Sequence, residues 1–145
     1  MEAATIASIN SMSSQVYQMG CQVDNLRGDL YELRKKLSDT SEALELHKKA
    51  SSGFNTDDGG NESSISSIGA IPNVKLASRY SKAFKKTRSA KQDNAVRAAS
   101  SISLSLEREI DRLEREIEAK EQMALSLEYQ MDSLRTQINL LYMGG

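Results

Sequence analysis

Residues that usually build a compact core are scarce in this 145-residue sequence. It has no Trp, two Phe and five Tyr, so aromatic residues make up only 5%. A globular domain of this size normally fills its core with aromatic side chains, and a thick layered core is therefore not expected. The charged fraction of 27% is ordinary, and the net charge of −1 neither requires nor excludes a nucleic-acid partner. The composition predicts an elongated all-α protein that buries a stripe of side chains.

The scarcity extends to residues that bind metals or perform catalysis. Cys21 is the only cysteine, which excludes an intrachain disulfide and a thiolate metal cluster. His47 is the only histidine, so a histidine cluster for zinc is excluded as well. We interpret His47 as a partly exposed residue near a helix end. The pair Gly59-Gly60 is not followed by the Lys-Ser/Thr of a phosphate loop. We therefore expect a protein that is not an enzyme and has no cofactor, metal or catalytic residue.

Long apolar runs are also missing. No segment approaches the ~18 apolar residues of a membrane span, so no membrane span is expected. The first residues (MEAAT) contain neither a basic region nor an apolar region of the kind found in signal peptides. We expect a cytoplasmic protein. If it is exported together with a partner, the route needs no signal peptide.

Three regions differ in composition. Residues 1–50 are typical of a helix and carry a heptad pattern. Residues 51–73 contain four Gly, six Ser and the only Pro, and we interpret them as a flexible loop. Residues 74–145 lack Gly and Pro up to Gly144, and are expected to form a basic helical stretch over 74–97 that continues into a second heptad helix.

The two heptad patterns predict an antiparallel, coiled-coil-like helical hairpin with a longer second helix. The alternating spacing of three and four residues places each apolar series on one seam. The seam residues are Val16, Met19, Val23, Leu26, Leu30, Leu33 and Leu37 in the first segment and Ile110, Leu113, Ile117, Leu127, Met131, Leu134 and Ile138 in the second. Basic side chains flank the first seam and acidic ones the second. The favoured register brings Val23 near Leu127 and Arg27 beside Glu121. Because a two-helix pair is marginal alone, part of the apolar surface is expected to serve partner helices.

The basic stretch 74–97 is the candidate partner-binding region. It holds eight Lys or Arg residues against one Asp, a local charge of +7. The candidate binding residues are Leu76, Tyr80, Phe84, Lys82, Lys85, Lys86 and Arg88. The apolar members are four residues apart and would share one helix face that fits an apolar groove on a partner. Binding of a nucleic-acid backbone by the cations and contact with acidic residues of the 51–73 loop remain as alternatives.

Two pairs of sequence runs carry a resemblance to a known family. They are residues 9–16 (INSMSSQV) with 24–27 (DNLR), and 106–117 (LEREIDRLEREI) with 132–139 (DSLRTQIN). Such paired heptads around a Gly/Ser break resemble small helical proteins of Gram-positive bacteria. These are encoded with LXG toxins of the type VIIb (Esx) secretion system and belong to the WXG-like superfamily. The resemblance covers residues 6–48 and 102–142.

The resemblance implies a function without catalysis. Proteins of this family bind the N-terminal helical domain of an LXG toxin, and a second small helical protein acts with them to stabilise the toxin and target it for export. A chaperone and targeting role is therefore expected here. Two other functions stay open from the sequence, namely a coiled-coil protein associated with nucleic acid through residues 74–97, and a self-assembling structural coiled coil.

Overall fold

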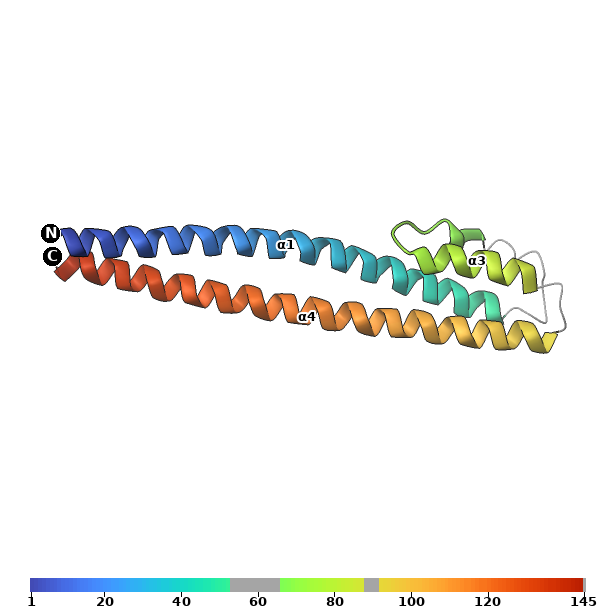
Figure 1. Cartoon of the computed structure of the whole chain (residues 1–145). Helices are drawn as coiled ribbons and strands as arrows, with labels where there is room; N and C mark the ends of the chain where they lie inside the picture. Colours follow the sequence, from blue (N-terminus) through green and yellow to red (C-terminus); the bar gives the residue numbers. More distant parts are fainter. Residues whose placement is uncertain (53–65, 88–91, 145) are drawn as a thin grey trace. The chain divides into compact units, whose positions relative to one another are not determined.

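The computed structural model describes residues 1–52, 66–87 and 92–144, and every regular element in these ranges is a helix. Helix α1 spans Ala3–Ser52, α3 spans Lys75–Thr87 and α4 spans Gln92–Gly144 (Figure 1). A single helical turn lies at residues 66–69. The long helices α1 and α4 pack against each other, so the predicted all-α helical hairpin is confirmed. None of the described helices is both long enough and apolar enough to cross a membrane.

The chain divides into two compact units. The first combines Met1–Glu32 with Glu116–Gly145, and the second is Leu33–Arg115. Each long helix therefore contributes one part to each unit. Every large side chain that is fully buried among the described residues lies in the second unit. These fully buried residues are Tyr80, Phe84, Ile68, Leu106, Leu113, His47 and Thr40.

In the first unit, α1 and α4 form an antiparallel two-helix pair. Arg27 Nη2 lies 2.7 Å from Glu128 Oε1, and Lys120 Nζ lies 3.2 Å from Asp29 Oδ2. The numbers rise along α1 while they fall along α4, as antiparallel pairing requires. The ion pair of Arg27 falls one heptad beyond Glu121, which we expected beside it. All four charged side chains are partly exposed, so these pairs contribute at most ~1 kcal/mol each.

The second unit adds α3 to the pair formed by α1 and α4. The rings of Tyr80 and Phe84, both on α3, are each 1% exposed, and Ile68 of the preceding helical turn is 0% exposed. These side chains form one cluster with small residues of α1 and α4, including Ala43 and Ala99. The small side chains leave room for the two rings, so this unit has a true three-helix core.

The expected single helix over residues 74–145 is wrong. Helix α3 ends at Thr87, α4 begins at Gln92, and residues 88–91 lie outside the described residues. One continuous helix would carry Tyr80 and Phe84 away from α1 and leave both rings in water. Burying a large apolar side chain is worth roughly 1.5–3 kcal/mol, which favours folding α3 back. Much of the basic stretch over residues 74–97 therefore belongs to a short packed helix and does not continue into α4.

The prediction of a flexible loop over residues 51–73 is wrong at both ends of this range. Helix α1 continues to Ser52, and residues 53–65 lie outside the described residues. The turn at 66–69 is ordered by the burial of Ile68. Its last residue, Gly69, lies so close to α3 that a Cβ atom there would be 2.8 Å from Ser81 Cβ. Asn73 then adopts a φ of 63°, a left-handed conformation that Asn tolerates well, and α3 begins two residues later.

Candidate functional site

The predicted seam residues are all at least half-buried. Val23, Leu26, Leu30, Leu33, Leu113 and Ile117 are buried, and all the others are half-buried. Half-burial is concentrated in the first unit, where no third helix covers the seam among the described residues. There Leu127, Met131, Leu134 and Ile138 of α4 all keep contact with water. The seam is therefore a packing surface that the first unit leaves partly open.

One side of the open seam in the first unit is free of charge. Two successive grooves follow it, and none of the twelve residues that line them is charged. The lining residues are Ala7, Ser8, Ser11, Met12, Gln137 and Leu141 in one groove and Gln15, Met19, Tyr129, Gln130, Ser133 and Leu134 in the other. We call this surface the uncharged face. In a chain with 27% charged residues, twelve uncharged residues on one surface set it apart.

The opposite side of the same helix pair has the reverse character. The groove there is lined by five charged residues, together with Gly20, Val23 and Met131. The charged residues are Asp24, Arg27, Glu128, Asp132 and Arg135. On that side, the Arg27–Glu128 ion pair connects α1 to α4 across the groove. The two sides of the first unit are therefore chemically distinct, and only the uncharged face offers an apolar floor without ions to desolvate.

Helix α3 does not present the binding face that we expected. Tyr80 and Phe84 pack 5.3 Å apart between ring centroids inside the chain's own core, and Leu76 is half-buried. The prediction that these residues meet a partner is corrected, because α1 and α4 already supply their apolar groove. Lys82 and Lys85 are exposed. The side chain of Lys86 and the whole of Arg88 lie outside the described residues.

The burial of the two rings also affects the nucleic-acid alternative. Binding of single strands usually combines cations with aromatic side chains on which bases stack. Tyr80 and Phe84 are the aromatic residues of the basic stretch, and neither can stack on a base while it is buried. The exposed cations of α3 remain as an electrostatic surface without a base-reading element.

The exposure that we predicted for His47 from the sequence is wrong. It is 2% exposed, whereas we expected partial exposure near a fraying helix end. Its Nε2 lies 2.8 Å from the carbonyl oxygen of Ala99, and its Nδ1 bonds the hydroxyl of Tyr80. A carbonyl oxygen only accepts, so Nε2–H donates to Ala99 and Nδ1 accepts from Tyr80. His47 thus joins α1, α3 and α4 through one neutral ring.

The environment of this cluster shifts both titrating groups toward their neutral forms. Burial lowers the pKa of His47, the bond to Ala99 opposes that shift, and the charge of Lys48 adds to the lowering. Burial also raises the pKa of the Tyr80 hydroxyl well above its usual range. The rings meet edge to face, with centroids 4.6 Å apart. Both side chains are buried, and the hydrogen bonds of His47 link the three helices of the second unit in its core.

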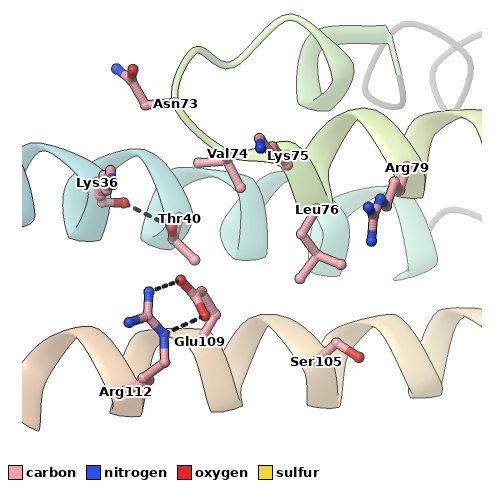
Figure 2. Close-up of a pocket in the computed structure, with 10 residues that line it drawn as sticks. All are labelled: Lys36, Thr40, Asn73, Val74, Lys75, Leu76, Arg79, Ser105, Glu109 and Arg112. Atoms are coloured by element: carbon pink, nitrogen blue, oxygen red, sulfur yellow. Dashed lines mark hydrogen bonds and ion pairs between the residues drawn. The ribbon is translucent and has the colours of Figure 1, made fainter.

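A cleft of about 400 Å³ lies between the three helices of the second unit (Figure 2). Four cations line it, namely Lys36 from α1, Lys75 and Arg79 from α3, and Arg112 from α4. The remaining lining residues are Thr40, Asn73, Val74, Leu76, Ser105 and Glu109. We call this site the cationic cleft. The sequence showed its α3 cations, but the contributions of α1 and α4 could not be seen without the packing of α3.

Glu109 is the single acid of the cationic cleft. Arg112 binds it through two bonds, Nε to Oε2 at 3.0 Å and Nη2 to Oε1 at 2.6 Å. This hydrogen bonding lowers the pKa of Glu109 against the effect of burial, and the charges of Arg112 and Lys36 add to the lowering. Glu109 is therefore ionised at neutral pH, and the cleft keeps a charge of +3. Within the described part of the chain, no group of His, Cys, Asp or Glu side chains could hold a metal ion.

Comparisons of the chain with protein-family models, with curated proteins and with solved structures found no match.

Proposed function

We propose that this protein is a non-enzymatic chaperone and targeting factor that binds the N-terminal helical domain of an LXG toxin for type VIIb secretion. A second small helical protein would share the complex. The proposal rests on the resemblance of the two heptad segments to that family. The structural observation that supports it is the uncharged face of the first unit.

The uncharged face has the properties that a docking helix requires. Ser8, Ser11 and Ser133 are small, so a partner helix can approach the backbone closely. Gln15 and Gln130 can both donate and accept hydrogen bonds, and they carry no charge that would have to be desolvated.

The same face supplies apolar contacts of adaptable shape. Met12 and Met19 have flexible thioether side chains that adjust to different partner surfaces. Tyr129 is 78% exposed and lines one groove, so it can act as an aromatic anchor. One or two helices laid on this face would complete a three- or four-helix bundle and cover the open seam.

The test is co-purification with a matched pair of charge variants. The chain is co-expressed with the N-terminal helical domain of each LXG toxin encoded in the same genome. The double variant Ser11→Arg/Ser133→Arg places two cations on the uncharged face. The control Asn10→Arg/Asn139→Arg adds the same charges one residue earlier on α1 and six residues later on α4. Both control positions fall on the heptad face of Asp24 and Asp132, which is already charged.

The face variant is expected to lose at least tenfold in affinity, about 1.4 kcal/mol, while the control stays within twofold. All four positions are exposed, so both proteins should keep their helical content. Failure of the unmodified chain to bind any such domain would refute the proposal, as would equal losses in both variants. A chain that forms a stable oligomer alone, and loses it only in the face variant, would instead be a self-assembling coiled coil.

A further inference from the structure

We propose that the cationic cleft of the second unit binds an acidic peptide segment of a partner protein. This site is distinct from the uncharged face, and the inference does not depend on which protein the first unit binds. The observation that carries it is the convergence of four cations from three helices on one cleft.

The charge of the cleft is not neutralised within the described chain. Glu109 is the only carboxylate in its lining, and Arg112 already binds it on two atoms. No salt bridge joins Lys36, Lys75 or Arg79 to a carboxylate of the described residues. Positive charges held close together repel one another, so a carboxylate between them would relieve that repulsion as well as form new bonds.

The shape and the apolar part of the cleft favour a peptide over a free anion. Figure 2 shows Leu76 and Arg79 extending from α3 into the space above α4, with the Glu109–Arg112 pair on its other side. Val74 and Leu76 provide apolar surface beside the cations. A volume of about 400 Å³ is within the usual range of ligand sites, and far exceeds the space needed for one small ion. A segment that alternates acidic and apolar side chains would use both parts of the lining.

The position of the cleft makes α3 the specificity element. Lys75 and Arg79 are one helical turn apart, so both face the same side of α3. That side is fixed in place because Tyr80 and Phe84 are buried behind it. Lys82 and Lys85 lie on the same helix and are exposed, but they do not line the cleft. The chain thus supplies a matched control for any effect of charge alone.

The experiment measures binding of a short fluorescein-labelled peptide that repeats Glu-Leu-Asp-Ala, by fluorescence anisotropy with the full chain near physiological salt. A peptide that repeats Gln-Leu-Asn-Ala serves as the uncharged control. Lys75→Gln/Arg79→Gln is expected to weaken binding of the acidic peptide at least tenfold. Lys82→Gln/Lys85→Gln removes the same charge from the same helix and is expected to change binding less than twofold.

A gain of affinity provides a second, independent arm. Glu109→Gln removes the one acid and releases the Arg112 guanidinium from its carboxylate partner, so this variant should bind the acidic peptide severalfold more tightly. Equal losses in the two double variants would show attraction to net charge only and overturn the proposal. Equal binding of the uncharged peptide, or displacement of the acidic peptide by millimolar inorganic phosphate or by a DNA oligonucleotide, would overturn it as well.

Discussion

The close approach of Gly69 to α3 predicts both the direction and the size of the stability change caused by a Gly69→Ala substitution. A Cβ atom at residue 69 would lie 2.8 Å from both Cβ and Oγ of Ser81, closer than the 3.0 Å below which such contacts essentially never occur. The φ of Gly69 is not in the left-handed region, so Ala adds no backbone strain. The Cβ of Ser81 belongs to α3 and cannot swing aside. Gly69→Ala must therefore shift the 66–69 turn away from the aromatic core.

We expect Gly69→Ala to destabilise the protein by about 1–3 kcal/mol, the usual cost of overpacking a core. The control is Gly28→Ala in α1, where a Cβ atom would meet nothing within 4 Å. This second change should stabilise the protein by about 0.5–1 kcal/mol, because Ala is the better helix former. The two substitutions are chemically identical, so the opposite signs isolate the steric contact.

The assay is guanidinium unfolding followed by circular dichroism, with Ser81→Gly added as a rescue. Ser81→Gly removes both atoms that the new methyl group would meet. In a double-mutant cycle, the combined variant should therefore recover stability relative to the sum of the single changes. A Gly69→Ala protein that is as stable as Gly28→Ala, or an absence of coupling with Ser81→Gly, would refute the close approach of the turn to α3.

Two further predictions concern the core of the second unit. The pKa of His47 is lowered in the folded state, whereas in the unfolded chain this histidine titrates near 6.5. The unfolded state therefore binds more protons as the pH drops below about 6.5. The free energy of unfolding should fall there by at most ~1.4 kcal/mol per pH unit. Guanidinium titrations at pH 7.5 and 5.5 should show this loss in the natural chain and not in His47→Gln; an identical loss in both would assign the slope to other groups. Phe84→Ala should cost about 3–5 kcal/mol in the same assay, whereas Tyr17→Ala on the exposed surface of α1 should stay within ~0.5 kcal/mol; equal effects would contradict the burial of Phe84.

The heptad seam was predictable because its signal is local and repeated. Residues such as Val23, Leu30 and Leu113 recur at spacings that only one helix face satisfies, and each is buried in the structure. The direction of pairing followed from the opposite charges beside the two seams. The exact ion pairs did not follow, because a long exposed side chain such as that of Arg27 can reach partners a full heptad apart.

The path of the chain between the long helices was not predictable in the same way. The spacing of Leu76, Tyr80 and Phe84 correctly indicated a helix with one apolar face. It carried no information on whether that face meets a partner or the chain itself, because both use the same chemistry. Ile68 was hidden in a Gly/Ser-rich segment whose average composition indicated a loop, although one buried side chain was enough to fix a helical turn.

His47 illustrates the same limit for a polar residue. The spacing of three and four residues that gives the first seam extends through Thr40 and Leu44 to His47. A buried imidazole needs partners for both nitrogens. Those partners come from Tyr80 and from the backbone of Ala99, and both depend on α3 folding back. The cationic cleft was missed for the same reason, since its cations come from helices that only tertiary packing brings together.

The uneven distribution of buried side chains has a consequence for how a partner could assemble with the chain. Where α1 and α4 belong to the second unit, the core of Tyr80 and Phe84 keeps the two helices joined. Where they belong to the first unit, the seam is thin and keeps contact with water. A partner that adds helices there meets two helices, α1 and α4, that are already aligned. The conformational freedom of these two helices was lost when the chain folded, so the partner needs to order only its own helices.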